Sequence, residues 1–202
     1  MVEWPVRSSC AAKGITRVVV STDDEEIAAI SKAAGADEVI MRPAHLASDT
    51  AATAPVVRHA IDYLGLSDDS SVVCIYPTAA ITAPLIEQAL GLGTAWPDLF
   101  VVSVGQHPSP LERALKLDAD GKMSAVSNKF LGSRTQDLPN HFYDAGKIYV
   151  ASASLWKSRE TMMSSPFVPF FVPRWASVDI DNPEDWDIAE ALHRAFVLGE
   201  KE

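Results

Sequence analysis

The sequence is poor in cysteine and in positive charge. Cys10 and Cys74 are the two cysteines in 202 residues, too few for a disulfide framework. Both lie among apolar neighbours, where a buried reduced thiol is the common state, so we assign neither a role. The 17 basic residues against 27 acidic ones give a net charge of −10. Binding to a phosphate backbone needs the opposite balance, which excludes nucleic acid as the partner.

A long apolar run is also missing. The longest stretch without charge, Ser70–Ile86, is interrupted by Pro77 and Pro84, whereas a membrane-spanning helix needs about 20 consecutive apolar residues. The first residues, Met1–Pro5, lack the basic start and apolar core of a signal peptide. We therefore expect no membrane association and take the cytoplasm as the default compartment.

Several catalytic signatures are absent. The histidines show neither the i, i+4 spacing of a zinc pair nor a flanking cysteine cluster; they are His45, His59, His107, His141 and His193. The sequence contains no Gly-x-Ser-x-Gly elbow, no Gly-x-Gly-x-x-Gly fingerprint and no phosphate-loop lysine motif. These absences disfavour a zinc enzyme, a serine hydrolase, a dinucleotide enzyme and a P-loop nucleotidase.

Strand and helix signals alternate along the first half of the chain. β-Branched runs that indicate buried strands are followed by helix starts with acidic or threonine caps and by glycine terminators. The predicted strands are Thr16–Ser21, Asp37–Met41, Ser71–Tyr76 and Leu99–Val104. The predicted helices start after Asp23 or Asp24 and end at Gly35, run from Thr53 to Leu64, and run from Thr82 to the breakers Gly91 and Gly93. This order predicts an α/β fold with a mostly parallel sheet and helices on both faces.

The pattern changes from Glu112 onward. Two short strands flank Asp118–Gly121, which is typical of a hairpin with a glycine-containing turn. Further strands are predicted at Ala145–Ala151 and at Pro166–Pro173, the latter at a sheet edge or in a loop because of its prolines. A last helix is capped by Asn182, and its apolar stripe ends at Gly199; the stripe is Trp186, Ala189, Leu192 and Phe196. We expect one domain over 1–202, with an antiparallel excursion over approximately 112–173.

Asp179 and Asp181 are the strongest candidates for chemistry. They follow the strand-like segment Ala176–Val178, and alternation along a strand would put both carboxylates on one face about 7 Å apart. Two hard oxygen donors suit Mg²⁺, which takes one or two carboxylates together with substrate phosphates. The alternative is that Asp181 only helps to cap the following helix.

Three further segments carry polar groups. Asp23 and Asp24 follow the first strand, but at least one of them is explained by helix capping. The loop from Arg42 to Thr53 could cradle a base or a phosphate with its backbone donors and one cation, or simply connect two elements. Arg134, in a second loop, could grip a carboxylate at two points or lie solvated at the surface.

Together these segments resemble the acylneuraminate cytidylyltransferase family. The resemblance is carried, in order along the chain, by Val18–Ile27, by Arg42-Pro43 with Leu46–Thr50, and by Asp179–Trp186. Within that family, Tyr76–Ala79, Gln136–Leu138 and Tyr143–Tyr149 look more like the pseudaminic acid branch than like the sialic acid synthetases. The resemblance runs from about Met1 to the final helix.

The resemblance implies a Rossmann-like, three-layer nucleotide-diphospho-sugar transferase fold in a homodimer. It implies that CTP and a nine-carbon acidic sugar, pseudaminic acid or a related nonulosonic acid, react with Mg²⁺ to give a CMP-sugar and pyrophosphate. It places Arg42, Ala51 and Thr53 around the cytidine, and Asp179 and Asp181 on the metal as the catalytic residues. Tyr76, Arg134, Gln136 and Tyr149 would then face the sugar acid.

The chain also departs from the family pattern. Members of the family begin with a strand and a glycine-rich loop that holds the triphosphate, whereas Met1 falls just after that loop. We therefore expect impaired or absent catalysis by the chain as written, because the main phosphate contacts are missing. The family commonly has proline, histidine and glutamine at the positions of Ala80, Tyr143 and Lys147. These three differences leave the identity of the acid sugar open. Two alternatives are a non-catalytic relative that serves as a binding or scaffolding subunit, and a cytidylyltransferase for another acid sugar.

Overall fold

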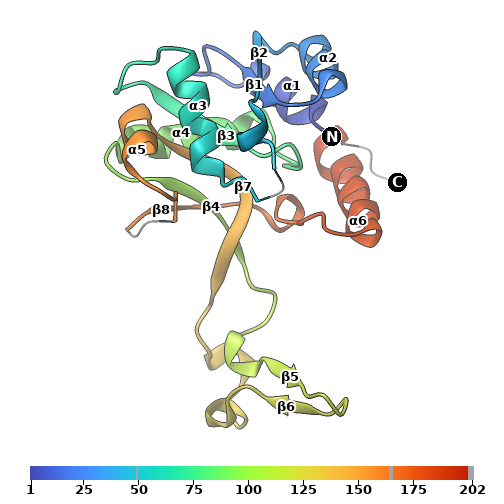
Figure 1. The fold of residues 1–202 in the computed structure, drawn as a ribbon. Coiled ribbons are helices and arrows are strands. Elements are labelled where there is room, and N and C mark those ends of the chain that lie inside the picture. The colour runs from blue at the N-terminus through green and yellow to red at the C-terminus, as the bar shows by residue number, and fades with distance from the viewer. Residues whose placement is uncertain (49, 164–165, 200–202) are drawn as a thin grey trace.

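Helices and strands alternate along the chain in the computed structural model, which describes residues 1–48, 50–163 and 166–199 (Figure 1). The helices are α1 (Glu3–Ala11), α2 (Glu25–Ala34), α3 (Thr53–Tyr63), α4 (Ala83–Ala95), α5 (Ala153–Ser158) and α6 (Pro183–His193). The strands are β1 (Val19–Thr22), β2 (Glu38–Met41), β3 (Ser71–Ile75), β4 (Val101–Gln106), β5 (Leu115–Leu117), β6 (Met123–Ala125), β7 (Phe142–Ser152) and β8 (Val168–Phe171). The predicted α/β alternation is confirmed.

The main sheet is mixed. Its strand order is β3-β7-β4-β8, and a separate parallel pair is formed by β1 and β2. Strand β7 runs antiparallel to both β3 and β4, and β4 runs parallel to β8. Strands β3, β4 and β8 therefore point the same way, and β7 alone opposes them between β3 and β4. The predicted edge position of the proline-rich strand is confirmed, because β8 lies at the end of the strand order.

Helices cover both faces of the main sheet and create two apolar cores. Helix α4 packs with Ile148 and Val150 of β7 on one face, where Ile86 and Ala89 are fully buried. Helices α3 and α5 cover the other face, where Trp156 packs edge-on against Phe100 at 4.9 Å between ring centroids. Alternation along β7 sends successive side chains to opposite cores, which gives three layers. Within the described residues, no helix is long and apolar enough to span a membrane.

Local helix signals are mostly confirmed, with two exceptions. Thr82 lies at the N-cap position of α4, but its side chain makes no capping hydrogen bond. The Asp24 side chain accepts a hydrogen bond from the Ile27 amide, and Gly35 ends α2 with a φ of 111°. The expectation that Gly91 and Gly93 terminate α4 is wrong, because the helix continues to Ala95. The reason at Gly93 is packing: a Cβ there would lie 2.7 Å from Cγ1 of Val150, so glycine lets the helix approach the sheet.

An arm projects from the layers between β4 and β7 (Figure 1). Its base is closed by a hydrogen bond of 2.9 Å from the His107 amide to the His141 carbonyl, and its outer part is the predicted hairpin of β5 and β6. The antiparallel excursion expected over 112–173 therefore divides into two parts. Only its first part lies in the arm, whereas residues from Phe142 onward return to the main sheet as β7 and β8.

The segment before α6 corrects another expectation. Residues 176–178 form no strand; a 3-10 turn over Arg174–Ala176 leads into an irregular stretch. The Asn182 cap of α6 is confirmed. The predicted apolar stripe is only partly covered. Trp186 on α6 is 42% exposed, and Phe196, in the π-helical turn Arg194–Leu198 that follows α6, stacks on Trp175 and is 58% exposed.

Candidate functional site

A bulge in the main sheet shapes the centre of the candidate site. On β4, Val102 pairs with Tyr149 and Val104 pairs with Asp144, so β7 carries extra residues opposite Ser103. The Ser103 hydroxyl accepts hydrogen bonds from the amides of Lys147 and Ile148, both at 3.1 Å. These bonds satisfy two amides that the shift in register leaves without ladder partners.

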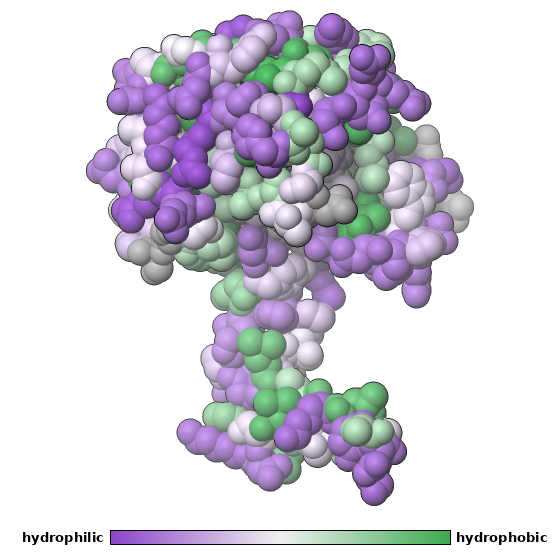
Figure 2. All heavy atoms as spheres, viewed as in Figure 1, coloured by the Kyte–Doolittle hydropathy of each residue, from purple (hydrophilic) through white to green (hydrophobic). Residues whose placement is uncertain are grey.

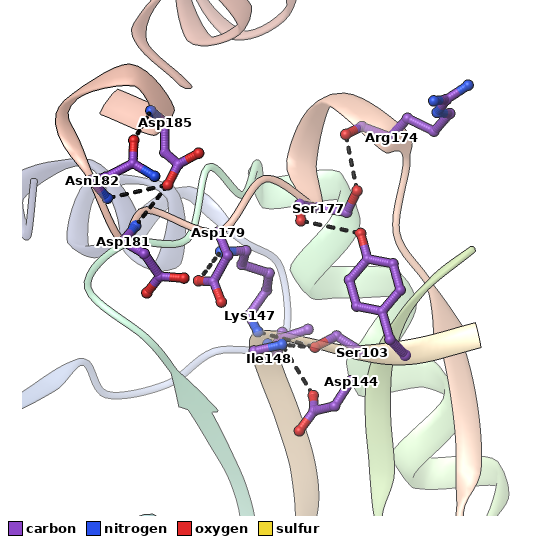
Figure 3. Close-up of polar contacts among 12 residues, drawn as sticks. Ser103, Asp144, Lys147, Ile148, Arg174, Ser177, Asp179, Asp181, Asn182 and Asp185 are labelled. Atoms are coloured by element: carbon purple, nitrogen blue, oxygen red, sulfur yellow. Dashed lines mark hydrogen bonds and ion pairs between the residues drawn. The ribbon is translucent and has the colours of Figure 1, made fainter. Parts of the chain in front are cut away.

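The bulge places Lys147 at the carboxyl end of β3, where its carbonyl accepts a hydrogen bond from the Tyr76 amide. The Lys147 side chain is 1% exposed, and its Nζ lies 3.7 Å from Oδ1 of Asp179, whose side chain is 74% exposed (Figure 3). Burial lowers the pKa of Lys147, and the negative charges of Asp179 and Asp181 oppose that shift. A buried cation therefore lies beneath the two aspartates singled out in the sequence.

The backbone of Asp181 is fixed by the cap of α6. One carboxylate oxygen of Asp185 accepts hydrogen bonds from the amides of Asp181 and Asn182, both at 3.1 Å, and the Asn182 side chain accepts one from the Asp185 amide (Figure 3). Asn182 and Asp185 thus supply the capping side chains. The Asp181 carboxylate is not needed for the cap and is left for another role.

Asp179, Asp181 and Asp185 line one hollow of about 370 Å³. Its other polar walls come from the arm base, from β7 and from the turn before Asp179; they include Gln106, Tyr143, Arg174 and Ser177. No group of three or more His, Cys, Asp or Glu side chains within the described ranges could hold a metal ion by itself. Two carboxylates still fit Mg²⁺, because that ion completes its shell with water and substrate phosphates.

A second polar cluster joins three of the other predicted residues. The Thr53 hydroxyl, at the start of α3, is hydrogen-bonded to the Tyr76 hydroxyl. The Tyr76 ring lies 5.5 Å from that of Tyr149, whose hydroxyl donates to Asp144. Burial raises the pKa of both tyrosines, and Asp144 adds to the effect at Tyr149, so both phenols stay neutral. Tyr149 itself is 1% exposed and lies beneath the surface.

Arg42 lies directly after β2. Its guanidinium donates to Asp23 at 3.0 Å, and its amide donates to the Thr22 carbonyl at 2.7 Å, which joins the ends of β1 and β2. Ala51 precedes α3, and its amide donates to the Ser48 carbonyl at 2.9 Å. Asp49, part of the motif in this loop, lies outside the described residues.

Arg134 and Gln136 lie on the arm, in and beside a short 3-10 turn over Thr135–Asp137. Arg134 pairs with Asp137 at 3.2 Å and is 78% exposed. The arm projects away from the layers (Figure 1), so these two residues do not line the hollow that contains Asp179 and Asp181.

Three residues of this site carry no clear mark in the sequence. Lys147 stands out there only as a departure from a family pattern, and Gln106 and Arg174 do not stand out at all. Arg174 follows Pro173 five residues before Asp179, and that proximity is the one available signal. The position of Lys147 depends on the bulge opposite Ser103, which is a pairing between strands far apart in the sequence.

Solved structures establish the class of fold. The chain superposes on a structure titled 4-diphosphocytidyl-2C-methyl-D-erythritol synthase with a TM-score of 0.64 and 10% identity, covering 95% of this chain and 89% of that one. It superposes on a CMP:2-keto-3-deoxy-manno-octonic acid synthetase, solved in complex with CTP, with a TM-score of 0.52 and 13% identity, covering 97% and 74%. The fold is the Rossmann-like α/β fold of nucleotidyltransferases.

Sequence comparisons confirm the resemblance to cytidylyltransferases. Residues 1–91 match the family model described as cytidylyltransferase. The chain is 26% identical to pseudaminic acid cytidylyltransferase of Campylobacter jejuni over 96% of this chain and 85% of that protein. It is 29% identical to CMP-N,N′-diacetyllegionaminic acid synthase of Legionella pneumophila, over 93% and 80%. It is 22% identical to N-acylneuraminate cytidylyltransferase of Escherichia coli, over 96% of this chain and 46% of that protein.

Proposed function

We propose that this chain is a cytidylyltransferase that joins the CMP part of CTP to a nonulosonic acid sugar, with release of pyrophosphate. The observation that carries the proposal is the convergence of Asp179 and Asp181 on one hollow above the buried Lys147. The similarity to pseudaminic acid cytidylyltransferase over 96% of the chain supports the reaction type. Neither finding favours the alternative of a non-catalytic scaffolding subunit.

Asp179 and Asp181 would hold Mg²⁺. When bound, the ion would draw negative charge from the phosphate at which a sugar hydroxyl attacks. The chain's own residues would determine where the ion binds. Asp179 and Asp181 face the hollow, and the cap of α6 fixes the backbone of Asp181. Arg174, in the same wall, offers a guanidinium that suits the carboxylate or phosphate of a substrate.

The cytidine would lie near Arg42, Ala51 and Thr53. Arg42 is already held by Asp23, and Thr53 is joined to Tyr76. Because Tyr76 also packs on Tyr149, the Thr53–Tyr76 contact would connect the nucleotide side of the site with the sugar side. The sugar is proposed to be pseudaminic acid or a close relative, and the reaction is proposed to take place in the cytoplasm.

The arm is proposed as the interface of a homodimer. Apolar side chains on its two strands are largely exposed: Leu115 is 60%, Leu117 68% and Met123 63% exposed. Hydrophobic residues are visible along the arm in Figure 2. A patch of this kind on a projecting hairpin is typical of a contact surface. Arg134 and Gln136 lie on the arm and do not line the hollow of their own chain. In such a dimer they would contact the second copy.

The test is a turnover assay with CTP, Mg²⁺ and a panel of nonulosonic acids, followed by pyrophosphate release. The proposal predicts release with pseudaminic acid or a close relative and a loss of release in Asp181→Asn. Release with a different acid sugar alone would correct the substrate. If Asp181→Asn is as active as the unaltered chain, the assignment of the aspartate pair is wrong.

A further inference from the structure

The Lys147 ammonium has an unusual environment. The side chain is 1% exposed, and among the described residues its Nζ has no hydrogen-bond partner. Its contact with Asp179, at 3.7 Å, is longer than a hydrogen bond. A buried ammonium without hydrogen bonds disfavours folding unless nearby negative charge compensates it.

That negative charge comes from the hollow. Asp179, Asp181 and Asp185 line it, and Arg174 is the basic residue among the lining residues in the described part of the chain. The Asp179 side chain is exposed to the hollow on one side and faces the lysine on the other (Figure 3). Lys147 therefore acts on the hollow through Asp179 without lining it.

We propose that Lys147 is a positioning residue of the metal site. Its ammonium holds the Asp179 carboxylate in place when no divalent cation is present, and it lowers the affinity of the Asp179–Asp181 pair for a free divalent cation. The inference rests on the proposed role of the two aspartates as metal ligands.

The charges explain why the ammonium weakens binding of the free ion. A carboxylate that already faces one positive charge attracts a second one less, and the buried position of Lys147 keeps water away from the ammonium side of the pair. A cation that arrives on a triphosphate is largely neutralised by the phosphate charges and meets less repulsion. The aspartate pair would thus take up its cation together with the nucleotide and would not keep it as a resident ion.

The test measures binding of Mn²⁺, used as a probe for Mg²⁺, by the loss of the free Mn²⁺ electron paramagnetic resonance signal. Lys147→Gln and Lys147→Met are compared with the unaltered chain in the absence of nucleotide. We expect both variants to bind Mn²⁺ about tenfold more tightly. Lys157→Gln is the matched control, because Lys157 pairs with Asp68 at the surface at 3.0 Å. It should leave Mn²⁺ affinity unchanged. A purely structural lysine would not increase metal affinity when removed.

Two further variants separate this inference from the proposed metal role. Asp179→Asn and Asp181→Asn should weaken Mn²⁺ binding both in the unaltered chain and in combination with Lys147→Gln. If they do, but Lys147→Gln and Lys147→Met bind Mn²⁺ no more tightly than the unaltered chain, the role of Lys147 is overturned and the metal site stands. If the asparagine variants bind Mn²⁺ as the parent chains do, the aspartates are not metal ligands and both proposals fail.

Discussion

The Tyr149 hydroxyl lies 2.8 and 2.9 Å from the two carboxylate oxygens of Asp144, across the bulge of β7. Asp144 also accepts a hydrogen bond from the Gly146 amide at 3.0 Å. The pair therefore closes the loop of extra residues that carries Lys147 toward Asp179.

Tyr149→Phe should lower the free energy of unfolding by about 1 kcal/mol, because it removes a hydrogen bond to a charged acceptor and leaves the ring in place. Urea unfolding followed by circular dichroism measures the change. Tyr63→Phe is the control, since Tyr63 is 60% exposed and its change should stay within about 0.5 kcal/mol. Equal stabilities of the two variants would show that the Tyr149 bond contributes nothing.

The same tyrosine predicts sensitivity to alkali. Burial and Asp144 raise the pKa of Tyr149 above that of an unfolded tyrosine. The unfolded chain therefore loses its proton first, and the folded state loses stability as the pH rises above about 10. The unfolding free energy of Tyr149→Phe should fall less steeply with pH in that range. A parallel pH dependence in the two proteins would contradict this account.

Gly93 and Gly91 form a matched pair on α4. Gly93→Ala should be about 1–3 kcal/mol less stable than Gly91→Ala, because the new Cβ would lie 2.7 Å from the fully buried Val150. A Cβ at Gly91 meets open space, so Gly91→Ala should gain about 0.5–1 kcal/mol from helix propensity. Thermal and urea unfolding of the two variants measure the difference, and equal stability would show that α4 does not approach the sheet as closely as described.

The two cysteines should differ in reactivity. Burial raises the pKa of Cys74 to about 12, so its thiol stays protonated and shielded at pH 8. Cys10 is exposed. Titration with an aromatic disulfide reagent should therefore modify one thiol in the native chain and two after unfolding. Cys74 is partly buried, so native Cys10→Ser should react slowly or not at all, and rapid modification of Cys74 in that variant would contradict its raised pKa.

The arm predicts a change in oligomeric state. Leu115→Ser combined with Leu117→Ser should weaken dimerisation at least about tenfold per leucine, because each side chain would no longer be buried in the interface. Sedimentation velocity over a range of concentrations measures the dissociation constant. Ile188→Ser, on α6, is the control, since Ile188 is 45% exposed and lies away from the arm. A parent chain that is monomeric throughout would refute the dimer.

Elements with local signals could be predicted from the sequence. The Asp24 cap, the Gly35 terminator and the Asn182 cap act within one helical turn, and the structure confirms each. The prediction at Gly93 is wrong because the role of that glycine is set by Val150, which is distant in sequence. The strand predicted before Asp179 is wrong because an apolar alternating run can also pack as a short turn, as Ala176 does here.

Only the part of the site that depends on residues close together in the sequence was predictable. Asp179 and Asp181 stand two residues apart, and the structure brings both to one hollow, although not on a strand. The contact of Thr53 with Tyr76, the burial of Tyr149 and the position of Lys147 depend on which strands pair, and no local pattern encodes that pairing.

The most direct test of the central claim is the product formed from CTP, Mg²⁺ and pseudaminic acid, identified by mass spectrometry. The account predicts a CMP-sugar whose rate of formation falls at least about a hundredfold in Asp179→Asn and in Asp181→Asn, with both variants folded. If no CMP-sugar forms with pseudaminic acid or any related nonulosonic acid, or if both variants form it at the parent rate, the account is contradicted.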